Sequence, residues 1–160
     1  MRADPRRLAI VAAVDADQID AVRTLILEYQ ASLGVDLGFQ QFDDEIAALA
    51  TMYGPPDGAL FLATLDDAPA GCVGVRRFEP GCCEMKRLYV RPSARRLHLG
   101  QRLADRAIEA ARGLGYHRMR LDTLPSMRQA QEMYVAMGFR EIPPYRHSPV
   151  PGTRCLEIQL

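Results

Sequence analysis

Six arginines fall within twenty residues near the middle of the chain: Arg87, Arg91, Arg95, Arg96, Arg102 and Arg106. The stretch includes an apolar run that ends at Val90, and it leads into an amphipathic helix that we expect to begin at about His98. The first backbone N–H groups of such a helix have no partner within it, and the helix dipole adds partial positive charge there. These groups and the arginine side chains predict a site for a phosphate or pyrophosphate.

The chain as a whole carries no net charge, because its 160 residues contain 20 Lys and Arg against 20 Asp and Glu. A neutral chain with one basic loop favours a small anionic ligand over a polyanion, so we expect no nucleic-acid partner. A DNA-binding helix is the weaker alternative, since the arginines cluster toward the helix start. With no apolar run of membrane-spanning length and no signal-peptide pattern, we expect a cytoplasmic protein without a membrane partner.

The four cysteines lack the spacing of metal ligands. Cys82 and Cys83 are adjacent inside an apparent strand, and no Cys-x-x-Cys pair occurs. We therefore expect reduced, largely buried thiols and no metal site.

Apolar periodicity predicts one domain over residues 1–160, in which strands and helices alternate toward the C-terminus. Predicted strands cover residues 8–14, 59–65, 70–78, 82–90, 118–124 and 153–160. Predicted helices cover about 19–33, 42–49, 98–113 and 127–137. Short turns join the middle three strands, which is typical of an antiparallel meander. This order predicts an α+β (mixed α/β) fold with one sheet and helices on both faces.

Local motifs predict three helix ends, in two of the helices. Asp15 with Gln18, and Ser126 with Gln129, have the spacing of a capping box at a helix start. Gly138 follows the last predicted helix, and Phe139 is placed to cover that end.

Three segments in this order resemble the GNAT superfamily of acetyl-CoA-dependent N-acetyltransferases. Residues 87–92 (RLYVRP) are similar to the family's fourth strand. Residues 95–100 (RRLHLG) are similar to its Arg/Gln-x-x-Gly-x-Gly/Ala loop, with His98 at the middle glycine. Residues 130–139 (AQEMYVAMGF) are similar to its Tyr-x-x-x-Gly-Phe helix end. The resemblance implies the GNAT fold, with a central, mostly antiparallel mixed sheet between helices.

The resemblance also implies that the basic loop binds the pyrophosphate of acetyl-CoA and that the preceding strand binds its pantetheine and thioester. The implied cofactor-binding residues are Leu88, Tyr89, Val90, Arg95, Arg96, Leu97, His98, Leu99, Gly100, Gln101 and Arg102. The strand ending at Val90 is expected to splay from its neighbour, where a backbone N–H would stabilise an oxyanion. We expect His98 to adopt ordinary helical dihedrals, which leaves its amide usable.

Tyr134 is the candidate general acid by the same resemblance. A phenol with a pKa of about 10 is protonated at neutral pH and can donate to, or hydrogen-bond, a departing thiolate whose pKa is about 8.5. The alternative is a core aromatic that packs beside Met133 and Met137.

Glu84 is the candidate base, because an amine arrives as an ammonium ion and must lose a proton before it attacks. Alternation along a strand predicts that Glu84, Lys86, Leu88 and Val90 share one face. A salt bridge between Glu84 and a neighbouring arginine is the alternative. Asp122, at the end of another predicted strand, is a second carboxylate candidate.

The resemblance implies that the early helices and a late loop line the acceptor pocket. The candidate substrate-binding residues are Phe39, Gln40, Asp122 and Tyr145, with Arg146 and His147 beside them. The mixture of Tyr145, Arg146 and His147 favours a small acceptor that carries a carboxylate.

The sequence thus predicts a GNAT-type N-acetyltransferase that moves the acetyl group of acetyl-CoA to a primary amine of a small molecule or peptide. The transfer is expected to occur by direct attack in a ternary complex, without a metal. The alternative is a non-catalytic regulatory module that binds CoA or acyl-CoA. A homodimer is compatible with either function.

Overall fold

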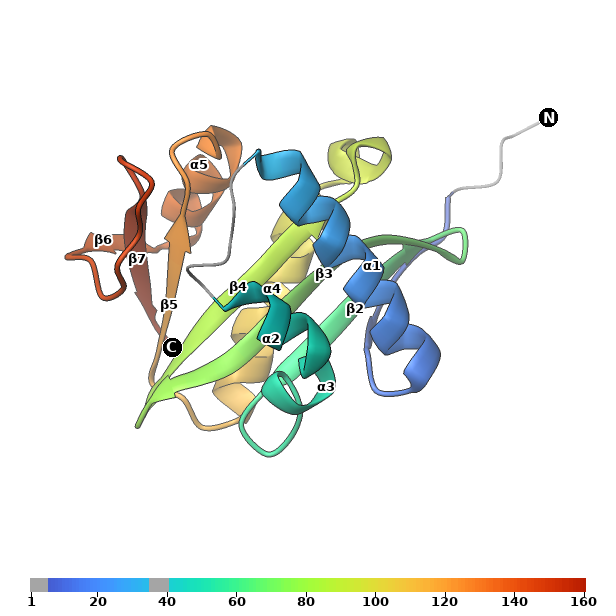
Figure 1. The fold of residues 1–160 in the computed structure, drawn as a ribbon, viewed down its shortest axis with the longest axis horizontal. Helices are drawn as coiled ribbons and strands as arrows, with labels where there is room; N and C mark the ends of the chain where they lie inside the picture. The colour runs from blue at the N-terminus through green and yellow to red at the C-terminus, as the bar shows by residue number, and fades with distance from the viewer. Residues whose placement is uncertain (1–5, 35–40) are drawn as a thin grey trace.

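The computed structural model describes residues 6–34 and 41–160, which form one mixed sheet flanked by helices (Figure 1). The strand order in the sheet is β1-β2-β3-β4-β5-β7-β6. The strands are β1 (Leu8–Ala12), β2 (Ala59–Leu65), β3 (Ala68–Glu79), β4 (Cys82–Val90), β5 (Arg118–Thr123), β6 (Arg140–Ile142) and β7 (Arg154–Gln159). Only the β4–β5 pair is parallel among these strands, which confirms the predicted mostly antiparallel sheet.

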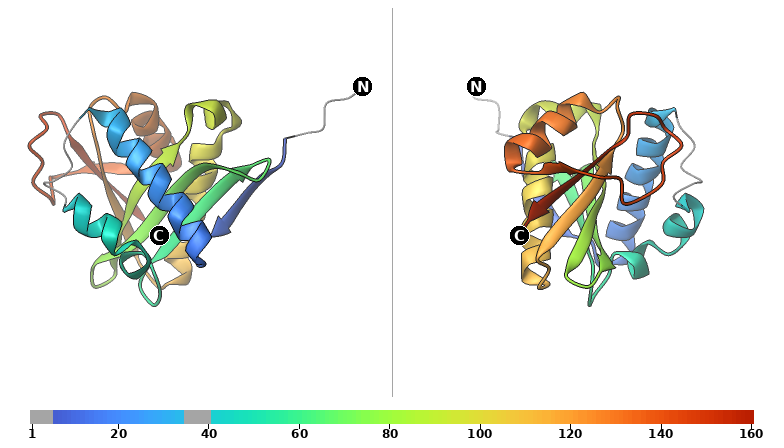
Figure 2. Two further views of the ribbon diagram at one scale, coloured as in Figure 1. Left: turned by 45° about the vertical axis from the view of Figure 1, so that its right-hand side comes forward. Right: turned by 90° about the vertical axis from the view of Figure 1, so that its left-hand side faces the viewer.

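Helices cover both faces of the sheet, as the two views of Figure 2 show. One face carries α1 (Ala16–Leu33), α2 (Phe42–Ala47) and α3 (Leu49–Met52), which bury Val22, Phe42 and Leu49 against it. The other face carries the 3₁₀ helix η2 (Pro92–Leu97), α4 (Leu99–Gly113) and α5 (Arg128–Met137), with Leu103 and Tyr134 in a second core. None of the described helices is long and apolar enough to cross a bilayer.

The helix ends match the sequence motifs in two of three cases. Asp15 and Gln18 form the predicted capping box of α1, and Gly138 ends α5 with a φ of 108°. The Ser126 capping box is wrong, because α5 begins one residue later with Met127 at its N-cap and no side-chain cap. A turn closed by a hydrogen bond from Met127 N to Leu124 O occupies the chain before α5, so Ser126 lies inside that turn.

A β-bulge in β4 changes which residues face each core. Cys72 and Gly74 of β3 pair with Tyr89 and Lys86, so one residue of β3 lies opposite two residues of β4. Arg87 is the extra residue, and its φ of 58° lies in the left-handed region. The side-chain alternation therefore reverses at Arg87.

For this reason, the prediction that Glu84, Lys86, Leu88 and Val90 share one face of β4 is wrong. Cys83 and Met85 share a core with Leu88 and Val90, although their numbers differ in parity. Glu84 and Lys86 are thus on the opposite face from Leu88 and Val90. The alternation of side chains in the sequence cannot locate an inserted residue that leaves the apolar pattern unbroken.

Strands β4 and β5 separate toward their C-terminal ends. They pair only between Cys82–Glu84 and Arg118–Arg120, although β4 continues to Val90 and β5 to Thr123. Figure 1 shows the two strands in contact at one end and apart at the other. This confirms the expected splay, and it opens the sheet beside Leu88 and Val90.

Candidate active site

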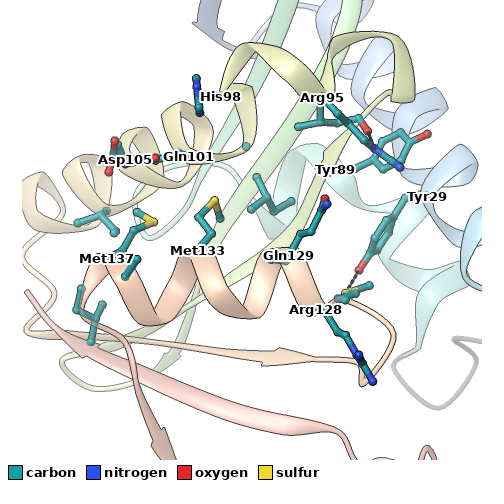
Figure 3. A pocket seen from close by; sticks show the side chains of 18 of the residues that line it. Tyr29, Tyr89, Arg95, His98, Gln101, Asp105, Arg128, Gln129, Met133 and Met137 are labelled. Atoms are coloured by element: carbon teal, nitrogen blue, oxygen red, sulfur yellow. Dashed lines mark hydrogen bonds between the residues drawn. The ribbon is translucent and has the colours of Figure 1, made fainter.

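A cavity of about 1190 Å³ lies where the C-terminal end of β4 meets α4 and α5 (Figure 3). Its walls include seven of the predicted cofactor-binding residues, namely Leu88, Tyr89, Val90, Arg95, His98, Gly100 and Gln101. Met133 and Met137 of α5 face the side chains of α4 across it. The cavity therefore has a polar end beside the start of α4 and an apolar stretch between the two helices.

The start of α4 presents backbone amides without helical partners. The first hydrogen bond within this helix runs from Arg102 N to His98 O at 3.1 Å, so the N–H groups of Leu99, Gly100 and Gln101 precede it. No side chain caps this end. Such amides, with the positive end of the helix dipole, suit an anionic group.

His98 is the N-cap of α4 and has φ 53° and ψ 27°, in the left-handed region. The expectation of ordinary helical dihedrals at His98 is therefore wrong. The chain must turn sharply between η2 and α4, and left-handed dihedrals at one residue make that turn. Glycine adopts them without strain, whereas a residue with a β-carbon does so at a cost of about 1–2 kcal/mol.

The arginines around this end have different partners. Arg95 is exposed, and its Nε donates to Val90 O at 3.1 Å. Arg91 is held by Glu28, with 2.9 Å between Arg91 Nε and Glu28 Oε2. The side chain of Arg96 lies outside what the structure describes. Among the other predicted residues, Leu97 and Arg102 lie outside the walls of the cavity.

The side chain of Leu99 is fully buried in the core, so this residue can offer a ligand only its backbone amide. Gly100, in contrast, leaves space for a ligand. A β-carbon added there would have only Met133 Sδ and Val90 Cγ2 as neighbours, both at 3.9 Å. The missing β-carbon therefore keeps the surface around the Gly100 amide open toward the cavity.

A smaller cavity of about 60 Å³ lies between the separated strands. Its walls come from β4, β5, α1 and α5, and its polar members are Tyr29, Lys86, Arg87, Asp122, Thr123 and Tyr134. The two cavities share Tyr29, Leu33, Leu88, Met127 and Ala130 as wall residues. The predicted acid Tyr134 and the second carboxylate candidate Asp122 therefore lie beside one space.

Tyr134 belongs to the core and also to the wall of the smaller cavity. Its ring lies edge-on to Phe139, with 5.5 Å between the ring centroids, and 7% of the residue is exposed. Burial raises the pKa of Tyr134 above its usual value, and the negative charge of Asp122 adds to this effect. The phenol thus keeps its proton at neutral pH.

Glu84 has no exposed surface and lies outside the walls of both cavities. Its carboxylate accepts from Arg76 Nε at 3.2 Å, from Arg146 Nη2 at 2.6 Å and from Tyr145 Oη at 2.9 Å. Burial alone would raise the pKa of Glu84, but the surrounding cations and the tyrosine hydrogen bond lower it overall. The structure therefore contains the salt bridge that was the alternative to a base.

Lys86 and Asp122 form an ion pair at the smaller cavity, with 3.6 Å between Lys86 Nζ and Asp122 Oδ1. Burial lowers the pKa of Lys86, and the charge of Asp122 opposes this shift. Sequence reasoning missed Lys86 and Tyr29 as wall residues. Lys86 had a signal, since it directly precedes the basic segment, whereas Tyr29 fits the apolar spacing of α1 and had none.

Two of the predicted acceptor residues, Phe39 and Gln40, lie outside the described part of the chain. Tyr145 lies on the loop between β6 and β7, and its hydroxyl is used by Glu84. The four cysteines are free and buried, as expected.

The sequence model of the acetyltransferase (GNAT) family matches residues 19–139. The chain belongs to the GNAT acetyltransferase family. An uncharacterized N-acetyltransferase from Schizosaccharomyces pombe is 40% identical to it over 158 residues, which cover 98% of this chain and 97% of that relative. This GNAT chain is accordingly an acyltransferase.

Solved GNAT structures share its fold. An acetyltransferase of the GNAT family from Staphylococcus aureus Mu50 superimposes with a TM-score of 0.79 at 20% identity, covering 96% of this chain and 99% of that one. A GNAT family acetyltransferase from Elizabethkingia anophelis, solved with acetyl-CoA bound, has a TM-score of 0.69 at 17% identity, with coverages of 96% and 98%. At these identities the likeness establishes the fold.

Proposed function

We propose that this GNAT acetyltransferase transfers the acetyl group of acetyl-CoA to a primary amine of a small molecule or peptide, by direct attack in a ternary complex. The observation that carries the proposal is the junction of the two cavities. One is large enough and polar enough at its α4 end for a nucleotide-like ligand, and the other holds Tyr134 and Asp122. A thioester lying across the junction has ionisable groups beside it.

The large cavity fits acetyl-CoA in size and in chemistry. The amides of Leu99, Gly100 and Gln101, with Arg95 nearby, suit a diphosphate. Beyond them, the ends of β4 and β5 have separated, so an extended pantetheine can run beside Leu88 and Val90. A related acetyltransferase binds acetyl-CoA on the same fold, which supports this assignment.

Proton transfer is assigned to the groups at the smaller cavity. An ammonium acceptor loses its proton before attack. Asp122, the carboxylate on the wall of the smaller cavity, accepts this proton directly or through a water. Lys86 lies beside Asp122 as its ion-pair partner. Glu84 is assigned a positioning role, since its oxygens are occupied by Arg76, Tyr145 and Arg146.

Tyr134 is assigned to the leaving group. When the amine nitrogen bonds to the thioester carbon and the C–S bond breaks, sulfur leaves with the electron pair as a thiolate. The nitrogen gives up its second proton to solvent as the amide forms, and a proton from solvent restores the phenol afterwards. A phenol that is still protonated at neutral pH can donate its proton to that thiolate or hydrogen-bond to it. Its burial in the wall fixes its direction without blocking the ligand.

The test replaces Tyr134 by Phe and measures CoA thiol release with a panel of primary amines. We expect kcat to fall by about 100-fold or more, while the Kd for acetyl-CoA in calorimetry stays within about two-fold. Tyr116→Phe is the matched control, because it removes a phenol that lies outside the walls of both cavities. That phenol donates a hydrogen bond of 2.6 Å to Asp57 O. Unchanged turnover in Tyr134→Phe would return this side chain to a packing role. Acetyl-CoA binding without thiol release from any amine would contradict catalysis.

A further inference from the structure

Seven charged side chains meet beside the smaller cavity, and we call them the buried ion network. Its cations are Arg76, Lys86, Arg87 and Arg146, and its anions are Glu45, Glu84 and Asp122. They come from α2, from β3, β4 and β5, and from the loop between β6 and β7. The network therefore joins one helix, three strands and one loop on this side of the split sheet.

The network is dry. The side chains of Glu84, Glu45, Lys86 and Arg87 are between 0% and 4% exposed. Charges in such surroundings are stable only when opposite charges and hydrogen bonds compensate them. An excess of one charge sign inside the network therefore calls for a compensating charge.

The balance is uneven among the described residues, with four cations against three carboxylates. Arg87 has Glu45, through contacts of 2.7 and 3.1 Å, and Lys86 has Asp122. Glu84, however, is shared by Arg76 and Arg146. Arg76 also reaches Glu45, with 3.8 Å between Arg76 Nη1 and Glu45 Oε1. Among the described residues, Arg146 therefore has Glu84 as its one ion-pair partner and shares it with Arg76.

The neighbouring ion pairs do not supply the missing anion. Arg118 and Arg120 pair with Glu79 and Glu157, so that group contains two cations and two carboxylates. The described part of the chain therefore leaves the buried ion network one negative charge short.

Arg146 is the member of the network that a ligand can reach. Its side chain is 31% exposed, the highest value in the network. The rings of Phe78 and Tyr145 lie 5.6 and 5.9 Å from its Cζ and hold the guanidinium in place. A fixed guanidinium with one edge toward Glu84 and part of its surface in solvent is suited to a second carboxylate.

We propose that the acceptor is a primary amine that also carries a carboxylate, and that Arg146 binds this carboxylate. The inference rests on the proposed function, because it names the class of amine that the same site acetylates. The acid group supplies the negative charge that the network lacks among the described residues. The charge of Asp122 acts on Arg146 together with that of Glu84. A short amino acid whose carboxylate binds Arg146 can therefore bring its amine to Asp122, on the wall of the smaller cavity.

The experiment compares amines that differ in one charge. Glycine, β-alanine and 4-aminobutanoate are assayed with acetyl-CoA against their carboxamides, which have the same lengths. We expect kcat/KM for at least one acid to exceed that for its amide by about ten-fold or more. The three lengths measure the spacing between the carboxylate site and the reaction centre.

Arg146→Gln is the decisive variant, because it leaves three cations against three carboxylates. The acid-to-amide ratio should fall to about one. Arg118→Gln is the matched control, since it breaks another arginine–glutamate pair, at the opposite end of β5 from Asp122, and should keep the ratio. General loosening of the loop would slow acids and amides alike, so the ratio separates charge recognition from a structural effect.

A thermal-shift series with CoA present tests the carboxylate site without turnover. The acids should raise Tm more than the amides do, and Arg146→Gln should remove the difference. Equal rates for acids and amides, or a ratio that survives Arg146→Gln, would overturn the inference while leaving acetyl transfer intact. Absence of thiol release from every amine would contradict the proposed function instead, and the thermal shifts would then decide on the carboxylate site alone.

Discussion

Gly100 leaves open space beside the start of α4, where the proposed function has the diphosphate bind. A β-carbon there would have no neighbour closer than 3.9 Å, so Gly100→Ala fits the protein but projects into the large cavity. Alanine also favours the helix, by about 0.5 kcal/mol or more. We therefore expect a Tm that is unchanged or higher, and an acetyl-CoA Kd in calorimetry weakened by about ten-fold.

The control for Gly100→Ala is Gly113→Ala at the other end of α4, where an added β-carbon meets nothing within 4 Å. This variant should keep acetyl-CoA affinity. Equal affinity in both variants would show that the ligand does not approach the start of α4.

His98 bears the strain of the turn before α4. Replacement by glycine relieves the left-handed dihedrals, and the added freedom of the unfolded chain offsets part of the gain. We expect His98→Gly to raise the free energy of unfolding by about 0.5–1 kcal/mol in urea titrations. His98→Ala retains the β-carbon and should bring no gain. A loss of stability in the glycine variant would mean that the imidazole makes a stabilising contact.

At the scale of elements, one buried ion pair connects α2 to the bulge of β4. Arg87 and Glu45 are 6% and 1% exposed, and they form two hydrogen bonds. Glu45→Ala leaves a buried guanidinium without this partner, so we expect a loss of about 3 kcal/mol in the free energy of unfolding. The control Glu141→Ala breaks the half-exposed pair with Arg154 and should lose less than about 1 kcal/mol.

The double variant Glu45→Met with Arg87→Met removes both charges. It should recover much of the stability lost in Glu45→Ala, because an apolar pair of similar volume replaces a buried ion pair without large loss. A double variant as unstable as Glu45→Ala would instead assign the effect to packing of α2.

Sequence patterns predicted most elements because their signals are local. The apolar runs of β2 and β4 and the Asp15 capping box each depend on a few adjacent residues. The bulge at Arg87 was missed because its cause is pairing with β3, which the sequence of β4 does not contain. The three-residue strand β6 was missed because it is too short for a periodic signal.

The candidate site divides in the same way. The basic loop and Tyr134 are motif residues, and the structure brings them to adjoining cavities. The pairing of Glu84 with Tyr145 and Arg146 joins residues about sixty positions apart, so no local pattern could reveal it. Similarly, the left-handed conformation of His98 follows from the junction of η2 and α4 and not from the residue type.

At the scale of the whole molecule, carboxylates paired with arginines link stability to pH. Cationic neighbours outweigh burial and hold the pKa of Glu84 below its ordinary 4.5, and the hydrogen bond from Arg91 lowers that of Glu28. A carboxyl whose pKa is depressed by folding stabilises the protein fully above its unfolded pKa, and this contribution is lost as pH falls through the folded pKa. We expect the free energy of unfolding to decline below about pH 4.5.

Glu84→Gln identifies the share of Glu84 in that decline. The variant should be less stable than the parent by about 2 kcal/mol at pH 7, and the two should converge as pH falls below about 4. Urea titrations across this range measure both curves. A difference that stays constant down to pH 3 would show that the charge of Glu84 is not the cause.

The shared wall of the two cavities has a kinetic consequence. Tyr29, Leu33, Leu88, Met127 and Ala130 bound both spaces, so whatever fills the larger one shapes the entrance and floor of the smaller. If acetyl-CoA binds first, it completes the surface that the amine contacts. If the amine binds first, part of that surface is absent. The enzyme should then show compulsory-order addition, with the free thiol product competing against the donor and not against the nucleophile.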